Sequence, residues 1–316
     1  MEIRAHILTA VGISATALGL AAFIGTPCSA AELLGPATLM LTLYVTSFGC
    51  DRGRPIFQGL AAAVGYTTAY STLVLTLATV GAPLADHQLA SCDEFFGLSV
   101  RGVIQWCAAH PTLQQMSDFI YYTAVPQTII TILALGYYDP RRLDAFVSRF
   151  MVAGIITAVG FVLLPAEGAS AYYGLPTPEH YRPILNAIHN LRSGSYPVSW
   201  RAAEGVIAFP SFHVTWGLLL MAAYRRHTWR LVLWPLNVLM IATAITSGMH
   251  YLVDVAAGFA VGMLAIAVVP CRSETEVSWL GRLVALVAGW YGSLDDEDQS
   301  GLSLPGSLSP EPASNG

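Results

Sequence analysis

Charged residues are scarce in this 316-residue sequence: they make up 11% of it, whereas soluble domains carry about 25%. None of the 15 basic residues is a lysine, because all of them are arginine. Hydrophobic residues account for 54% of the chain, and its mean hydropathy is +0.56. The composition therefore indicates an integral membrane protein with several apolar spans.

Several signatures of other function classes are also missing. The sequence has no Gly-rich phosphate loop, no zinc-type cysteine spacing and no EF-hand. Its net charge of −5 gives no indication of nucleic acid as a partner, and part of that charge comes from one acidic run, Asp295-Asp296-Glu297-Asp298. The run lies in a Ser-, Pro- and Gly-rich tail, so we expect solvated charge and disorder over 293–316 and no metal site.

Three of the five cysteines, Cys28, Cys92 and Cys107, fall in or beside one set of predicted loops. A Cys92–Cys107 disulfide can form if these loops are extracytoplasmic. The alternative is three unpaired thiols. The sequence leaves both open.

Apolar runs predict about eight transmembrane helices in an all-α bundle. The predicted spans are residues 6–25, 33–49, 57–82, 118–137, 148–165, 211–225, 229–247 and 251–270. Cys28-Ser29-Ala30 after the first run resembles a signal-peptidase site, but that run is long for a signal peptide and we expect a span.

The spans divide the chain into parts of different character. The loops 83–117 and 166–208 are long and are expected to hold short interfacial helices. Trp279 and Trp290 near the ends of an apolar stretch predict a further amphipathic helix at the interface. The expected divisions are N-terminal helices with an outward loop (1–117), a catalytic membrane core (118–270), the interfacial helix (271–292) and the acidic tail (293–316).

The arginines predict the orientation, because cytoplasmic loops carry most basic residues. In the eight-span assignment, eleven arginines lie on the side of the N-terminus. The four on the opposite side are Arg101, Arg182, Arg192 and Arg201. We therefore expect a plasma (inner) membrane protein with both termini in the cytoplasm and with His213 and His250 at the extracytoplasmic face.

Two histidines are spaced so that they meet at one membrane face. His213 follows Pro-Ser-Phe and His250 follows Ser-Gly-Met, 37 residues later. A helix of about 18 residues crosses roughly 27 Å, so one helix in and one helix back return His250 to the face of His213. Asp254 lies four residues after His250, where its carboxylate can reach the imidazole on one helix face.

These side chains suit phosphoryl transfer. If Asp254 fixes one ring nitrogen of His250, the other is free to act as a nucleophile. His213 lies in the first turn of a helix behind Ser211, where free backbone N–H groups and the helix dipole favour a phosphate. The alternative is that each histidine only satisfies a backbone carbonyl and that Asp254 only pairs with its neighbour. The combination of all three at matched depth favours a site.

The same residues carry a family resemblance. Pro-Ser-Phe-His at 210–213 and Gly-Met-His-Tyr-Leu-Val-Asp at 248–254 resemble the second and third signature motifs of the type-2 phosphatidic acid phosphatase superfamily. The chain is similar to its inositol phosphorylceramide synthase-like branch over about 118–270. The resemblance implies a six-helix membrane core that needs no metal and no cofactor. It further implies His250 as nucleophile, Asp254 as its orienting carboxylate, His213 as acid for the departing group and Ser211 as a phosphate ligand.

The sequence departs from the family pattern where a phosphate clamp is expected. The first motif, Lys-x6-Arg-Pro, is missing, and Ala244 stands where an arginine usually precedes the third-motif histidine. A phosphoryl group still needs cationic contacts. The alternative is that outward arginines only touch lipid headgroups. We expect the replacement clamp in the outward loop that leads into the second motif, from Arg201, Arg192 and Arg182.

Together these features predict a membrane enzyme that transfers or hydrolyses a phosphoryl-linked lipid headgroup through a phosphohistidine. With water as the acceptor it is a phosphatase. With a ceramide, diacylglycerol or sugar hydroxyl it is a phosphotransferase, which the synthase-like resemblance favours. The rival from another class is a non-catalytic lipid transporter or scramblase on the same fold. The near absence of charged residues within the spans argues against a polar transport path.

Overall fold

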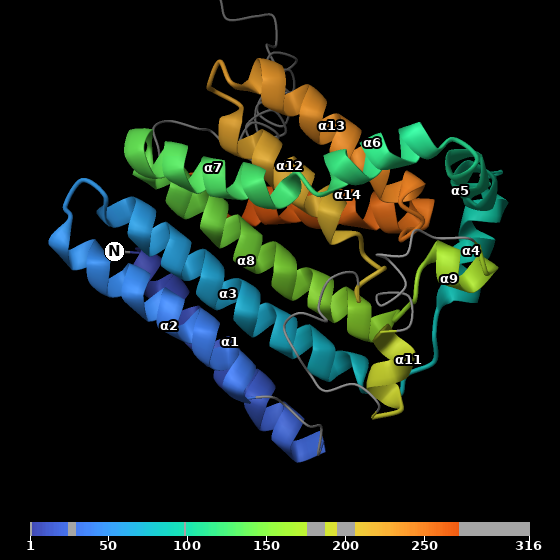
Figure 1. Ribbon diagram of the computed structural model, residues 1–316, viewed down its shortest axis with the longest axis horizontal. Coiled ribbons are helices and arrows are strands. Elements are labelled where there is room, and N and C mark those ends of the chain that lie inside the picture. The colour runs from blue at the N-terminus through green and yellow to red at the C-terminus, as the bar shows by residue number, and fades with distance from the viewer. Residues whose placement is uncertain (1, 25–29, 98, 176–186, 195–205, 272–316) are drawn as a thin grey trace, which may run out of the picture. The chain divides into compact units, whose positions relative to one another are not determined.

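A computed structural model describes residues 2–24, 30–97, 99–175, 187–194 and 206–271. Helices make up its regular structure, and the described segments contain no strand (Figure 1). All described helices belong to one compact unit, Met1–Ser273. The predicted interfacial helix within 271–292 and the tail over 293–316 lie outside the described residues.

The long helices follow the predicted apolar runs. Their bounds are α1 Glu2–Ile24, α2 Ala30–Thr46 with the 3₁₀ turn η1 Ser47–Gly49, α3 Arg54–Ala78, α7 Ala124–Tyr138, α8 Pro140–Leu163, α12 Phe212–Tyr224, α13 Arg230–Thr246 and α14 Leu252–Val268. Between them lie short helices: α4 Asp86–Phe95, α5 Val100–Ala108, α6 Pro111–Tyr121, α9 Ala169–Tyr173 and α11 Ala187–Arg192.

Three helical segments are long and apolar enough to cross a membrane: Arg54–Ala78, Pro111–Tyr138 and Pro140–Leu163. Five shorter apolar helices of 10–17 residues cover the other predicted spans. The prediction of an all-α protein with membrane-spanning helices is confirmed in these terms. The count of eight spans and the six-helix core stay predictions.

Two helix boundaries differ from the apolar runs. Helix α8 begins at Pro140, not near 148, because the Asp139 carboxylate caps it by accepting a hydrogen bond from Arg142 N at 3.2 Å. Polar caps, and not hydropathy, fix where a helix starts. The predicted span 118–137 is interrupted at Tyr122 and Thr123, which separate α6 from α7.

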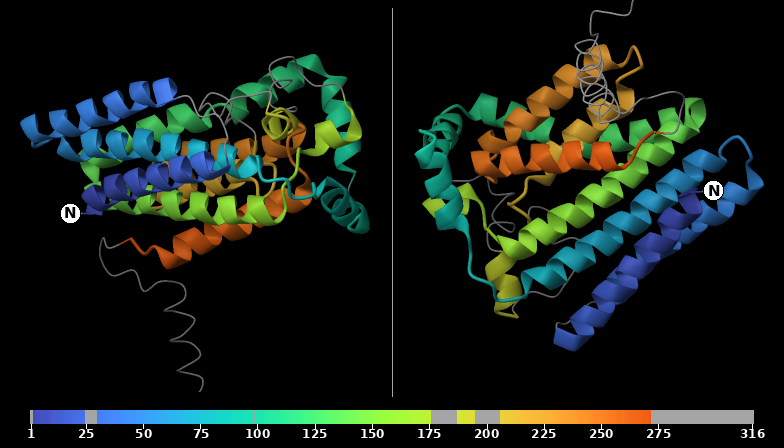
Figure 2. Two further views of the ribbon diagram at one scale, coloured as in Figure 1. Left: turned by 90° about the horizontal axis from the view of Figure 1, so that it is seen from below. Right: turned by 180° about the vertical axis from the view of Figure 1, so that it is seen from behind.

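The bundle has two sides, which Figure 2 shows from below and from behind. Helices α1 and α2 pack on α3, and α3 in turn contacts α7 and α8. On the other side α12 contacts α13, α14, α7 and α8. Tyr66 on α3 donates to the Met151 carbonyl on α8 at 2.8 Å, inside the main hydrophobic core.

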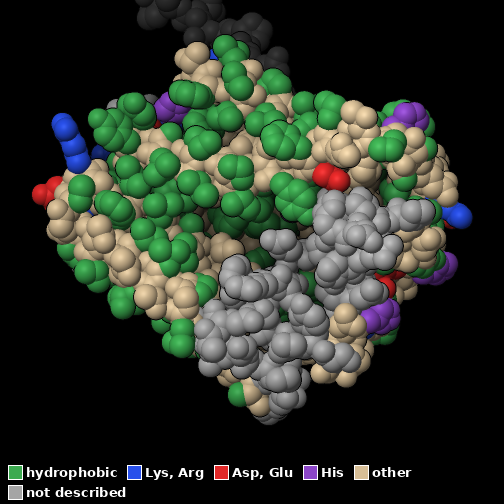
Figure 3. All heavy atoms as spheres, in the orientation of Figure 1, with side chains coloured by type: hydrophobic (Ala, Val, Ile, Leu, Met, Phe, Trp, Pro, Cys, Tyr) green, Lys and Arg blue, Asp and Glu red, His purple; other side chains and the backbone are tan. Residues whose placement is uncertain are grey.

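The surface agrees with a lipid environment. Hydrophobic side chains cover much of the visible face in Figure 3, and charged side chains are few there. Exposed large apolar residues lie on the long helices other than α3 and α12, for example Leu39, Ile130, Val159 and Leu264. Cys92 and Cys107 are free thiols in this structure, so the unpaired alternative holds for them.

Candidate functional site

The starts of α12 and α14 meet at one end of the bundle. Ser211, which precedes α12, donates its backbone N–H to the Asp254 carbonyl in the first turn of α14 at 3.0 Å. The short helices α4, α5 and α9 lie against this end, next to the start of α14 and the end of α13 (Figure 1). The second and third motifs are thus brought together by the packing of two helix N-termini.

Gly258 allows this close approach. A Cβ atom at this position would lie 2.3 Å from the Ser211 carbonyl oxygen. The same backbone carries a further contact, because the Thr215 hydroxyl donates to the Gly258 carbonyl at 2.8 Å. The relative positions of His213 and His250 therefore depend on glycine at position 258, where any side chain would separate the two helix starts.

Gly258→Ala is expected to destabilise the protein by about 3 kcal/mol, the upper end of the usual cost of overpacking, because backbone and not a flexible side chain must move. Thermal unfolding in detergent measures this as a lower Tm. Gly12→Ala on α1 is the matched control, since its Cβ would meet nothing within 4 Å. An unchanged Tm for Gly258→Ala would show that α12 and α14 do not pack in this way.

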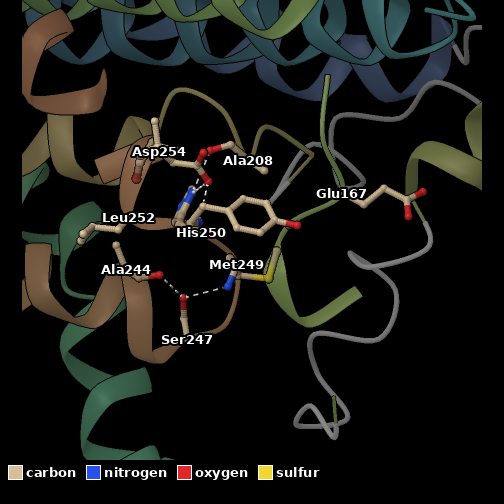
Figure 4. A network of polar contacts seen from close by, with 12 residues as sticks. Glu167, Ala208, Ala244, Ser247, Met249, His250, Leu252 and Asp254 are labelled. Atoms are coloured by element: carbon tan, nitrogen blue, oxygen red, sulfur yellow. Dashed lines mark hydrogen bonds and ion pairs between the residues drawn. The ribbon is translucent and has the colours of Figure 1, made fainter. Parts of the chain in front are cut away.

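His250 is buried in the turn between α13 and α14, with 3% of its surface exposed. Its Nδ1 lies 2.8 Å from the Ala208 carbonyl oxygen. Because a carbonyl can only accept, Nδ1 carries the proton of this contact, and in the neutral ring the lone pair is then on Nε2. Figure 4 shows the imidazole between Ala208 and Asp254, while the Glu167 side chain points away from this group.

Asp254 is fully buried beside the same ring nitrogen. Its Oδ2 lies 3.6 Å from His250 Nδ1 and accepts a hydrogen bond from Tyr251 N at 2.7 Å. Its Oδ1 has no hydrogen-bond partner among the described residues. The carboxylate thus lies where the i, i+4 spacing predicted it, but the closer partner of Nδ1 is a backbone carbonyl, the kind of contact that the alternative interpretation of this histidine expected.

His213 is half-buried in the first turn of α12. Its ring stacks on Tyr121 with centroids 3.7 Å apart and planes 19° apart, and Trp216 packs beside it. It lies close enough to His250 for a charge on one imidazole to act on the other. The stack fixes the ring plane, which a side chain that delivers a proton requires.

The N-terminus of α12 is free to bind an anion. The Ser211 hydroxyl is fully buried and has no partner among the described residues. It does not cap its own helix, and the backbone N–H groups of residues 212–214 have no acceptor within the described part of the chain. A helix start with an unused hydroxyl and unused N–H groups is suited to a phosphate.

The N-terminus of α14, in contrast, is already occupied by carboxylates. Asp93 on α4 accepts hydrogen bonds from Leu252 N at 2.8 Å and Val253 N at 2.9 Å. Asp254 accepts from Tyr251 N. Of these two helix starts, that of α12 is therefore the one whose N–H groups remain available to an anion among the described residues.

A second carboxylate of α4 connects the residue before α14 to the two residues before α9. Asp86 accepts from the Tyr251 hydroxyl at 2.9 Å and from the backbone N–H groups of Glu167 and Gly168, both at 3.0 Å. No structural or catalytic role was predicted for Asp86 or Asp93 from the sequence. Their only signal was the spacing of seven residues, which puts both on one face of a short helix.

Of the three arginines predicted to form a phosphate clamp, the structure describes one. Arg182 and Arg201 lie outside the described residues. Arg192 lies at the end of α11, where its Nε donates to the Ala78 carbonyl at 3.3 Å and one guanidinium nitrogen has no partner among the described residues. It is near Glu167 and has no direct contact with His213 or His250.

Two acidic side chains near this end of the bundle have raised pKa values. Burial raises the pKa of Asp93, and the N–H groups of Leu252 and Val253 partly oppose this. Burial also raises the pKa of Glu167, while His189, whose Nε2 lies 2.8 Å from the Glu167 carboxylate, lowers it. Within the described segments, no group of three or more His, Cys, Asp or Glu is arranged to hold a metal ion.

Comparison with protein families gives a match to the PAP2 superfamily over residues 87–268, more than half of the chain. The chain belongs to the PAP2 superfamily. This is the type-2 phosphatidic acid phosphatase superfamily that the two histidine motifs resemble, so the predicted superfamily is confirmed. No curated protein and no solved structure gave a significant match.

The PAP2 match reaches further toward the N-terminus than the resemblance over about 118–270. It begins at 87 and so includes almost all of α4, whose Asp93 holds the start of α14. Membership suggests phosphatase or phosphotransferase activity on lipid phosphates in a membrane. The branch within the PAP2 superfamily is not identified by the match.

Proposed function

We propose that the protein is a lipid phosphotransferase or phosphatase that acts through a phosphohistidine on His250. The observation that carries the proposal is the bond from His250 Nδ1 to the Ala208 carbonyl, which in the neutral ring leaves the lone pair on Nε2. An oriented imidazole with a free nitrogen is a nucleophile, and PAP2 membership supplies a phosphorus centre for it to attack.

In the first step Nε2 of His250 attacks phosphorus and the bond to the departing lipid or headgroup oxygen breaks. Protonated His213 gives its proton to that oxygen, so no free alkoxide forms. In the second step neutral His213 takes a proton from the acceptor hydroxyl, whose oxygen attacks phosphorus and breaks the P–N bond. Asp254 stabilises the positive charge on the His250 ring in both steps.

The phosphoryl oxygens bind at the free N-terminus of α12, together with the Ser211 hydroxyl. Asp86, Asp93 and Asp254 give this end of the bundle three buried carboxylates, so a phosphate requires cations nearby. We propose that Arg192 contributes one when substrate binds, since one of its guanidinium nitrogens is unused. Arg182 and Arg201 are the other proposed clamp residues.

Headgroup transfer to an alcohol such as ceramide or diacylglycerol, as in an inositol phosphorylceramide synthase, is the preferred form of the reaction. Simple hydrolysis uses the same residues. The proposed location is the plasma (inner) membrane, with both termini cytoplasmic. A cluster at the opposite end of the site helices supports this orientation: Arg149 donates to the Val269 carbonyl at 3.0 Å, and Arg142 and Arg225 lie nearby.

The test is turnover of a defined lipid panel by the purified full-length protein in detergent. The panel contains phosphatidate, a prenyl diphosphate and phosphatidylinositol, each with and without ceramide or diacylglycerol, and each with and without EDTA. We expect turnover that EDTA does not reduce. Release of inorganic phosphate, or of inositol phosphate from phosphatidylinositol, identifies hydrolysis, and a new phospholipid that appears only with the alcohol identifies transfer. Absence of turnover with every donor and acceptor would favour the non-catalytic lipid transporter.

A further inference from the structure

We propose that Asp93 is the positioning residue of the nucleophile: by capping α14 it holds the His250 turn and keeps the Asp254 carboxylate beside the imidazole. This inference rests on the proposed function of His250. It assigns a role in the reaction centre to α4, a short helix that contains neither of the two histidine motifs.

The contacts of Asp93 are those of a complete helix cap supplied from another helix. Both carboxylate oxygens accept a backbone N–H, from Leu252 at 2.8 Å and from Val253 at 2.9 Å. The side chain is buried, with 2% of its surface exposed. The first N–H groups of any helix lack intrahelical acceptors, so a buried helix start needs such a partner.

The cap acts on His250 through the chain. His250 is in a turn and not in a helix, so no regular backbone hydrogen bonding fixes its direction. Tyr251, Leu252 and Val253 follow it directly, and carboxylates hold the N–H groups of all three. On its other side, Gly248 has a positive φ of 79° and its carbonyl accepts from Ser170 N at 2.8 Å. The turn is therefore anchored at both ends.

The cap also decides what Asp254 binds. Asp254 occupies the third position of α14, from which an acidic side chain readily turns back to the free N–H groups of its own helix. With Asp93 on Leu252 and Val253, only Tyr251 N remains for Asp254. Without Asp93, the Asp254 carboxylate is drawn to the helix start and away from His250 Nδ1, which it now approaches to 3.6 Å.

Asp93→Asn tests this, because the amide keeps one acceptor oxygen and replaces the other by a donor that faces an N–H group. Glu94→Gln is the matched control, since Glu94 is the next residue on α4 and is exposed. The readout is a single turnover with enzyme in excess over the lipid substrate identified in the panel. We expect the rate constant to fall about 100-fold for Asp93→Asn, as for a misplaced reacting group. Glu94→Gln should match the wild type.

A merely structural role gives a different result. Partial unfolding only reduces the amount of active enzyme, so as long as the folded enzyme still exceeds and saturates the lipid, the rate constant stays that of the wild type, and that outcome would overturn the proposal. A rate constant for Asp93→Asn equal to that of the wild type would overturn it as well.

A second readout needs no substrate. The ¹⁵N shifts of labelled histidine, with the His250 signal assigned through His250→Gln, report which ring nitrogen carries the proton. We expect the Nδ1–H form in the wild type and in Glu94→Gln, and a mixture of both forms in Asp93→Asn. The same single form in all three would contradict the role of Asp93. If the wild type turns over no lipid but the shifts respond as expected, the proposed function fails and the positioning of His250 by Asp93 stands.

Discussion

His250→Gln is expected to reduce lipid turnover by about 10⁴-fold or more, the usual effect of removing a catalytic nucleophile. Glutamine keeps a polar side chain of similar length but has no nitrogen lone pair that can attack phosphorus. The measurement is kcat on the lipid identified in the panel, together with trapping of a ³²P-labelled enzyme. The wild type should become labelled in a bond that acid cleaves and base does not, and the variant should remain unlabelled.

His110 offers a matched control for this variant. Its Nδ1 lies 2.8 Å from the Trp106 carbonyl, the same kind of contact that His250 makes, but it is exposed on the short loop after α5. His110→Gln should therefore leave turnover unchanged. Substantial turnover or labelling by His250→Gln would show that the phosphoryl group does not pass through this residue.

His213→Gln is expected to slow the reaction of a natural lipid by about 10²–10⁴-fold, the contribution of a positioned general acid. The reason is the leaving group, because a lipid alkoxide departs poorly without a proton. A p-nitrophenyl phosphate ester, whose phenolate departs unaided, should lose far less rate in this variant. The measurement compares kcat of wild type and variant on both substrates.

His227 serves as the control for this comparison, because it follows the opposite end of α12. His227→Gln should be close to wild type on either substrate. An equal loss on the good and the poor leaving group would assign His213 to phosphate binding and not to proton transfer.

Much of the fold followed from the apolar runs. Every predicted span overlaps a helix, since runs of apolar residues in this chain exceed the length of a helical turn many times over. The residues at which helices start could be predicted less well from the sequence. Helix α8 begins eight residues before its predicted span because Asp139 and Pro140 start it, and a hydropathy window does not register a cap.

The pairing of the two motifs could be predicted because helix length is fixed by rise per residue. The sequence placed His213 and His250 at one level, and the structure brings the starts of α12 and α14 together there. Which ring nitrogen is protonated could not be predicted, since the partner is the carbonyl of Ala208. Every residue has such a carbonyl, and no side-chain pattern marks the one that is used.

The hydrogen bonds between Asp93 on α4 and the start of α14 could not be predicted, for a different reason. Asp93 and the residues it holds are 159 and 160 positions apart, and nothing in a single sequence relates them. Acidic residues in a loop between membrane helices are ordinarily solvated, so burial was the missing information.

The length of α12 has a consequence for how a lipid reaches the site. Its 13 residues rise only about 20 Å, which is roughly 10 Å less than the hydrocarbon thickness of a bilayer. If its arginine-rich end lies at one membrane surface, Ser211 and His213 end below the opposite one. A lipid can then slide in from the side and bend its headgroup inward while its acyl tails stay among those of its neighbours. A hydrophobic alcohol dissolved in the same leaflet would follow that route, whereas water would have to enter from above.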